Sequence, residues 1–357
     1  MRTFLRRLGT AFLFLAVALC FVPGVIPPFL DRIYYRGPTS GHFDGAHFFN
    51  PEDRAHPPPA TPPARFLNRW LTGEGRARWP ERVAVTPSVP PRRVDGQKML
   101  VTWIGHSTVL VQTAGLNILT DPIWSERASP VSFAGPKRVR APGVRFEDLP
   151  KIDLILVSHN HYDHMDLATL KRLWDRDRPL IVTSLGNDAI LKDHGIGAAA
   201  GDWGQTIRGP GGAAVKIERV HHWGSRWGVD RNRALWSGFS VQLPGGNIFF
   251  AGDTGFGDGS WPGEAARDGP YRLAILPIGA YSPREVMQGN HMNPDESVAA
   301  FRRLGARTAI GVHWGTFQLT FEAIDDPPKR LLAALQSQGV APERFVAGEV
   351  GKTFEVP

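Results

Sequence analysis

The sequence Ser158-His159-Asn160-His161-Tyr162-Asp163-His164 directly follows an apolar run at 152–157, which is typical of a buried strand. It reads H-x-H-x-D-H. Side chains alternate along an extended chain, so His159 and His161 project to one side. Asp163 and His164 follow where the chain turns toward a helix predicted from Leu167 to Trp174. The segment therefore presents three imidazoles and one carboxylate to the end of a strand.

This ligand chemistry indicates a metal site. Imidazole and carboxylate together suit zinc, with iron or manganese as second choices. One segment of this kind can serve two adjacent cations if other parts of the chain supply further ligands. The alternative is a polar turn that is rich in His by chance, but clustered buried rings without partners are costly.

Further ionisable residues end other apolar runs. His221 and His222 follow the run 216–220, Asp253 lies in the turn Gly252–Gly255, and His313 ends the run 310–312. Glycine lets the backbone turn sharply beside Asp253. Any one of these residues alone could be an ordinary strand end. Together with the central motif they form a set of the right size and chemistry for a metal site at a sheet edge.

The distribution of apolar runs predicts the fold class. Strands alternate with helices after residue 99, which favours an α/β protein with two mixed β-sheets face to face and helices outside, an αββα sandwich. The predicted strands are Leu100–Ile104, Thr108–Gln112, Leu116–Thr120, Ile152–Ser158, Leu180–Thr183, Ala214–Val220, Leu235–Leu243, Asn247–Ala251, Leu273–Pro277 and Thr308–Val312. The predicted helices after the motif are Leu167–Trp174, Asn187–His194, Asp295–Leu304 and Pro327–Gln338.

Composition limits the function classes. The chain has 357 residues, is 42% hydrophobic and carries a formal net charge of +7, so it is a globular protein with a sizeable core. The positive excess lies within residues 1–98, and the remainder is balanced, which argues against a nucleic-acid enzyme. Cys20 is the one cysteine, so an internal disulfide and a thiolate metal site are both excluded.

The N-terminal region differs from the body. An uncharged stretch from Leu8 to Leu30 follows a basic start, and we expect a signal-anchor at residues 1–30 rather than a cleaved signal peptide or a core helix. Residues 31–98 are rich in Pro and Arg and are expected to form a surface arm. The catalytic domain is expected at 99–357. These features predict a membrane-associated protein with its catalytic domain in the periplasm.

Several of these motifs together resemble the metallo-β-lactamase superfamily. Within it they are similar to the branch of the N-acyl-phosphatidylethanolamine-hydrolysing phospholipases D and their bacterial relatives. The resemblance covers about residues 40–345. It is carried by Thr102–Thr108, Leu119–Pro130, Gly135–Arg138, Ser158–Asp166, Phe249–Gly255, Pro277–Tyr281 and His313–Phe317.

The resemblance implies two zinc ions per chain. The first would be held by His159, His161 and His222, and the second by Asp163, His164 and His313, with Asp253 bridging. His222 is preferred to its neighbour His221 because the family's ligand precedes a Trp, here Trp223. His106 is a recurring feature near the family's site and is interpreted as a supporting residue rather than a ligand.

The resemblance also implies a reaction. A metal-activated water would attack the phosphorus of N-acyl-phosphatidylethanolamine or a related phospholipid, giving phosphatidic acid and an N-acylethanolamine or ethanolamine. The catalytic residues would be Asp163, Asp253 and His291, which lies in a loop that matches the family's loop over the site. His291 would contact substrate or donate a proton, unless it is a structural loop histidine.

Other functions and partners follow from the same residues. The alternatives are a lactonase or a hydrolase of a soluble phosphorylated sugar on the same fold, or a non-catalytic zinc-binding envelope protein. A nuclease is disfavoured because the body carries no basic excess.

Expected partners are a phospholipid substrate, a membrane surface and, as one option, a second copy of the chain in a homodimer, but no nucleic acid.

Overall fold

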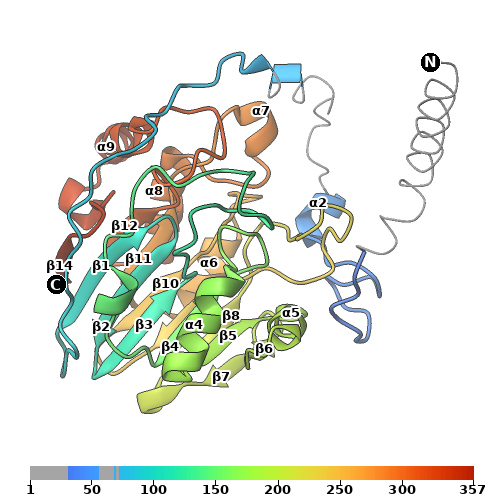
Figure 1. The fold of residues 1–357 in the computed structure, drawn as a ribbon, viewed down its shortest axis with the longest axis horizontal. Coiled ribbons are helices and arrows are strands. Elements are labelled where there is room, and N and C mark those ends of the chain that lie inside the picture. Colours follow the sequence, from blue (N-terminus) through green and yellow to red (C-terminus); the bar gives the residue numbers. More distant parts are fainter. Residues whose placement is uncertain (1–30, 56–67, 70–71) are drawn as a thin grey trace, which may run out of the picture.

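Two seven-stranded β-sheets lie face to face in a computed structural model that describes residues 31–55, 68–69 and 72–357 (Figure 1). The first sheet has the order β14-β1-β2-β3-β4-β5-β6, with β1 (Met99–Gly105), β2 (Thr108–Thr113), β3 (Leu116–Thr120), β4 (Leu154–Val157), β5 (Leu180–Ser184), β6 (Ala199–Gly201) and β14 (Thr353–Val356). The second has the order β13-β12-β11-β10-β9-β8-β7, with β7 (Thr206–Arg208), β8 (Ala214–Glu218), β9 (Gly238–Gln242), β10 (Asn247–Phe250), β11 (Tyr271–Pro277), β12 (Thr308–Val312) and β13 (Phe345–Val346).

Helices cover the outer faces of both sheets. Those on the first sheet are α4 and α5, and α8 packs against β11 of the second sheet with α6 and α9 beside it (Figure 1). The helices are α2 (Pro51–Ala55), α4 (Leu167–Asp177), α5 (Asn187–Asp193), α6 (Trp261–Ala265), α7 (Arg284–Met287), α8 (Pro294–Leu304) and α9 (Asp326–Ser337). The predicted αββα class is therefore confirmed.

The apolar runs are continuous because strands such as β4 are buried on both faces. Leu154 and Leu156 face the core between the two sheets, whereas Ile155 and Val157 face the helices outside the first sheet. The helices begin and end at local signals. Asn293 and Glu296 form a capping box at the start of α8, which ends at Gly305 with a left-handed φ of 65°.

The sheet topology gathers the carboxyl ends of several strands. In the first sheet, β3 and β4 run parallel, and so do β10, β11 and β12 in the second. Strand β8 also runs in the direction of β10, because both are antiparallel to β9 between them. Residues that follow β3, β4, β8, β10 and β12 are thereby brought to one edge of the sandwich.

The membrane prediction is wrong. In the parts of the chain that the structure describes, no helix combines the length and apolarity needed to cross a bilayer. The stretch from Leu8 to Leu30, on which the expected anchor and periplasmic localisation rested, lies outside the described residues. The division of the chain at residues 30 and 98 stays a prediction.

Candidate metal centre

The turn that carries the central motif is fixed by a buried carboxylate from the neighbouring strand. The backbone N–H of Ser158 donates to Asp121 Oδ1 at 2.8 Å, and the Ser158 hydroxyl donates to Asp121 Oδ2 at 2.6 Å. After His161 the chain closes a tight turn, with the Met165 N–H donating to the His161 carbonyl. Helix α4 then starts after Asp166, which caps it by accepting from Thr169. These contacts hold the motif at the end of β4.

All seven predicted ligands come together at the edge where these strands end. Four follow β4, and one each follows β8, β10 and β12. Six of the seven are buried, and His161 is partly exposed. Six of them form two adjoining groups, one with Asp163, His164 and His313, the other with His159, His161 and His222, and within each group the potential ligand atoms lie within 4.8 Å of one another. We call them the carboxylate half and the imidazole half.

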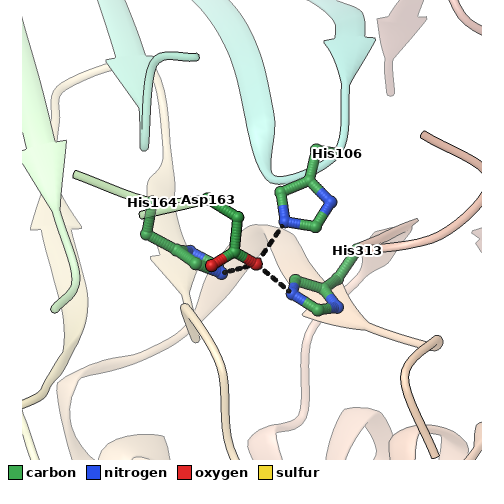
Figure 2. Close-up of side chains that lie close together, drawn as sticks. All are labelled: His106, Asp163, His164 and His313. Atoms are coloured by element: carbon green, nitrogen blue, oxygen red, sulfur yellow. Dashed lines mark hydrogen bonds and ion pairs between the residues drawn. The ribbon is translucent and has the colours of Figure 1, made fainter. Parts of the chain in front are cut away.

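In the carboxylate half, three rings point at one oxygen of Asp163 (Figure 2). Asp163 Oδ2 lies 2.8 Å from His106 Nε2, 3.3 Å from His313 Nε2 and 3.4 Å from His164 Nε2. Four ligand atoms around a tetrahedral zinc ion, each about 2.0–2.1 Å from it, lie about 3.3 Å apart. The spacing to His164 and His313 therefore matches shared ligation of one ion.

Asp253 lies between the two halves. Its Oδ2 is 3.1 Å from His164 Nε2 and 3.0 Å from His313 Nε2, and it is 3.9 Å from His222 Nε2 in the imidazole half. Asp253 Oδ1 is buried and has no hydrogen-bond partner among the described residues. One carboxylate is thus within reach of cations in both halves.

Hydrogen bonds at the far ring nitrogens orient three of the imidazoles. The Nδ1 atoms of His159, His164 and His222 lie 2.9 Å from Ser158 Oγ, 2.6 Å from Asp121 Oδ2 and 2.9 Å from the Asn290 carbonyl. Each of these oxygens can accept the Nδ1 proton, which would leave the Nε2 atom to bind a cation, as in metal-binding histidines. His222 Nε2 is buried without a hydrogen bond from the described residues. This donor set fits a divalent cation.

His106 contacts the site in a different way. Its 2.8 Å distance to Asp163 is shorter than a ligand–ligand spacing and matches a hydrogen bond. The residue has a left-handed φ of 53°, and its backbone is held by Thr316 Oγ1, which accepts from the His106 N–H, and by the His313 N–H, which donates to its carbonyl. This geometry agrees with a supporting residue that orients Asp163.

Two further predicted residues take separate positions. His221 points away from the centre, with Nδ1 2.6 Å from Glu52 Oε1. His291 is buried in the loop after α7, and its Nδ1 lies 3.8 Å from Asp253 Oδ2. His291 also groups with His222 and Asp253 as potential ligands. The structure thus brings His291 to the site and turns His221 toward α2.

The charges of the two halves differ. Burial lowers the pKa of His161 to about 3 and holds the pKa values of His159 and His222 well below their usual range. Burial alone would also lower the pKa of His313, but the Asp253 and Asp163 carboxylates raise it to about 9. The metal-free imidazole half is therefore neutral at pH 7, whereas the carboxylate half holds protons.

Sequence reasoning missed Asp121 and the α2 contacts. Asp121 follows β3 in the same way that predicted metal ligands follow β4, β10 and β12. The pattern of an ionisable residue at the end of an apolar strand could therefore have identified it. It is fully buried, with a φ of 30°. Glu52 carries no such signal, because its contact with His221 joins positions 169 residues apart.

Comparison with known proteins agrees with this geometry. The model of the beta-lactamase superfamily domain matches residues 116–314. An N-acyl-phosphatidylethanolamine-hydrolyzing phospholipase D of Caenorhabditis elegans is 37% identical over 269 residues, covering 72% of this chain and 76% of that protein. A UPF0173 metal-dependent hydrolase of Nitratidesulfovibrio vulgaris is 31% identical over 229 residues, covering 61% and 80%.

A solved structure shares the fold. Igni18, a metallo hydrolase of Ignicoccus hospitalis, superposes with a TM-score of 0.53 at 21% identity and covers 72% of this chain and 98% of its own. The matched family region contains the central motif, His222, Asp253 and His313. The chain therefore belongs to the metallo-β-lactamase superfamily and is a metal-dependent hydrolase.

Proposed function

We propose that the protein is a zinc-dependent phosphodiesterase of the phospholipase D type. Its substrate would be N-acyl-phosphatidylethanolamine or a related phospholipid, and its products phosphatidic acid and an N-acylethanolamine or ethanolamine. The observation that carries the proposal is the position of Asp253, whose Oδ2 is within 3.9 Å of ring nitrogens from both halves. The 37% identity to the nematode phospholipase D supports the choice of substrate.

The residues divide between two zinc ions in this proposal. The imidazole half would hold one ion, the carboxylate half the other, and Asp253 would contact both. Such a pair of zinc ions lowers the pKa of a shared water to near neutrality and offsets the charge that develops on a phosphate. Structural zinc sites are usually closed and hold one ion, so this donor set favours a catalytic centre over a structural one.

The chain's own groups then have distinct roles. Asp253 Oδ1, which is free of hydrogen bonds from the described residues, is placed to accept a proton from the attacking water and so to orient its oxygen toward phosphorus. As the new P–O bond forms, the bond to the ethanolamine oxygen breaks, that oxygen takes up a proton from solvent, and Asp253 releases to solvent the proton that it accepted. Asp163 is held in place by His106 and completes the carboxylate half.

His291 is assigned to substrate contact in this proposal. Burial lowers its pKa to about 4, so its ring is neutral at physiological pH, and a nearby cation would disfavour protonation further. A neutral ring is a weak general acid but a good hydrogen-bond donor. The Arg284 guanidinium donates to the His291 carbonyl at 2.8 Å and fixes the loop. His291 would therefore donate to a phosphate oxygen.

Lipid hydrolysis by the purified full chain tests the proposal. The protein would be offered N-acyl-phosphatidylethanolamine, phosphatidylethanolamine and a panel of lactones in the same detergent micelles, with its zinc content measured in the same sample. We expect release of phosphatidic acid that is lost with a chelator and restored by zinc. Turnover of lactones without turnover of either phospholipid would overturn the phospholipase assignment and favour a lactonase on the same fold.

A further inference from the structure

A segment that precedes both sheets lies against the imidazole half. We call residues 43–53 the arm segment; it lies outside the region matched by the superfamily model. Its anchors are Phe43 and Phe48, which are 2% and 1% exposed and belong to the main hydrophobic core cluster of the protein. The Phe48 N–H also donates to the Asn232 carbonyl at 2.8 Å. The arm segment is therefore firmly seated, and its position is set by the body of the protein.

The first contact of the arm segment with the site is made by Asn50. This side chain is 8% exposed, and its Nδ2 donates to the backbone carbonyl of His222 at 3.0 Å. The same amide nitrogen lies 2.9 Å from Asp53 Oδ2, which fixes the side-chain amide. The carbonyl of a predicted metal ligand is thus held by a residue 172 positions earlier in the chain.

The second contact is made by Glu52 at the start of α2. Glu52 Oε1 lies 2.6 Å from His221 Nδ1, and Oε2 accepts from the Arg219 guanidinium at 2.8 Å. The Glu52 side chain is 10% exposed. Arg219 is held in turn by Glu264 at 2.9 Å. One carboxylate therefore fixes two side chains of the segment that links β8 to His222.

The backbone of His221 is hydrogen-bonded to the loop that carries Asp253. Its backbone N–H donates to Thr254 Oγ1 at 3.0 Å, and its carbonyl accepts from the Gly255 N–H at 2.7 Å. Thr254 directly follows Asp253. The arm segment thus braces the backbones that carry His222 and Asp253. The described contacts of the arm segment include none with Asp163 or His313.

We propose that Asn50 and Glu52 are positioning residues that set the affinity of the imidazole half for its zinc ion. The proposal rests on the proposed function, because it assumes that the two halves bind zinc. Groups that orient metal ligands without touching the metal commonly change metal affinity about 10- to 100-fold. Asn50 contacts the His222 backbone directly, and Glu52 contacts His221, which is joined to the loop after Asp253. Because His222 is a predicted ligand of the imidazole half alone, the effect should be larger on the ion of that half.

Zinc titration of variants of the full chain tests this. Glu52→Gln replaces one of the two carboxylate oxygens that contact His221 and Arg219 with an amide nitrogen, and Asn50→Ala removes the donor to the His222 carbonyl. Glu264→Gln is the matched control, since it also removes a carboxylate from Arg219 but does not touch His221 or His222. Zinc would be titrated against a chromophoric chelator, and the Tm of the zinc-free proteins measured in parallel. We expect one of the two zinc affinities to weaken about 10- to 100-fold in Glu52→Gln and in Asn50→Ala, with both unchanged in Glu264→Gln.

The outcomes separate this inference from the proposed function. A wild-type protein that binds two zinc ions, with Glu52→Gln and Asn50→Ala variants of unchanged affinity, would overturn the inference alone. Equal weakening of both ions together with a lowered Tm would also overturn it, because the contacts would then serve only the fold. A wild-type protein that binds no zinc would overturn both the proposed function and the inference.

Discussion

The two halves of the centre hold their imidazole rings in opposite electrostatic states. In the imidazole half, two buried rings and the partly exposed ring of His161 have no carboxylate of their own, and their pKa values are held far below the usual range. In the carboxylate half, burial would also lower the pKa of His164, but Asp253, Asp163 and Asp121 hold it well above the usual range. The neighbouring carboxylates therefore decide which rings carry protons.

This difference predicts how each half takes up a metal. A neutral imidazole can bind a cation directly, whereas a protonated ring must first release its proton. In the metal-free protein, the positive charges of the His164 and His313 imidazolium groups balance the negative charges of Asp163 and Asp253. A metal ion bound in the carboxylate half would take over this role, and the two rings would release their extra protons. The imidazole half would bind its ion without such an exchange, and its affinity would depend on the orientation of its rings.

The largest expected effect comes from removing the carboxylate that both halves share. Asp253→Asn should lower phospholipid hydrolysis by more than about 100-fold, the upper range for groups that merely support a ligand. Asp258→Asn is the matched control, because Asp258 lies in the same loop, is exposed and accepts from Ser260. Initial rates in detergent micelles would be compared. Unchanged hydrolysis in Asp253→Asn would contradict the bridging role.

The next effect distinguishes the halves in the metal-free protein. His313→Gln removes a buried partner of Asp163 and Asp253 and should lower the free energy of unfolding by about 3–5 kcal/mol. His222→Gln removes a neutral ring with one hydrogen bond, to the Asn290 carbonyl, and should cost about 1 kcal/mol. Urea unfolding of chelator-treated proteins measures both. A larger loss in His222→Gln would reverse the assignment of charge to the halves.

The free energy of unfolding of the metal-free protein should also depend on pH, because the carboxylates of the centre raise the pKa of His313. The pKa of His313 is about 9 in the folded chain and about 6.5 when unfolded, so its stabilising contribution is complete below pH 6.5 and is lost as pH rises through 9. The free energy of unfolding should fall by about 3 kcal/mol over this window. Urea unfolding at pH 6, 7.5 and 9 measures this decrease, and the decrease should be smaller in His313→Gln. An equal slope in that variant would contradict the prediction.

The smallest expected effect concerns His106. His106→Asn should weaken zinc binding in the carboxylate half about 10- to 100-fold, since Asp163 loses the group that orients it, and should leave the imidazole half unchanged. Competition with a chromophoric chelator measures the two affinities. Loss of zinc from the imidazole half alone would show that His106 acts elsewhere.

Sequence reasoning predicted the fold from the order of apolar runs and a metal site from the ionisable residues that end them, and the resemblance to the superfamily then implied the set of seven ligands. Apolar runs that end in a single ionisable residue mark strand ends, and parallel strands bring such ends to the same edge. This pattern identifies Asp253 and His313 as candidate ligands although they lie far from the central motif in the sequence. Short strands such as β6, with the sequence Ala199-Ala200-Gly201, carry no apolar alternation and were not predicted.

Features that depend on tertiary packing could not be predicted in this way. The 2.8 Å contact of His106 with Asp163 and the contact of Glu52 with His221 each join distant segments, and no local pattern encodes them. The N-terminal stretch was interpreted from its apolar residues and its basic start, and the membrane prediction that rested on it was wrong.

Anomalous diffraction at the zinc absorption edge, from crystals of zinc-loaded protein, would show whether each half of the centre holds an ion. We expect two peaks about 3.5–4 Å apart. One should lie about 2.0–2.2 Å from ligand atoms of His159, His161 and His222, the other at that distance from Asp163, His164 and His313, with Asp253 contacting both. A single peak, or peaks held by other side chains, would contradict it.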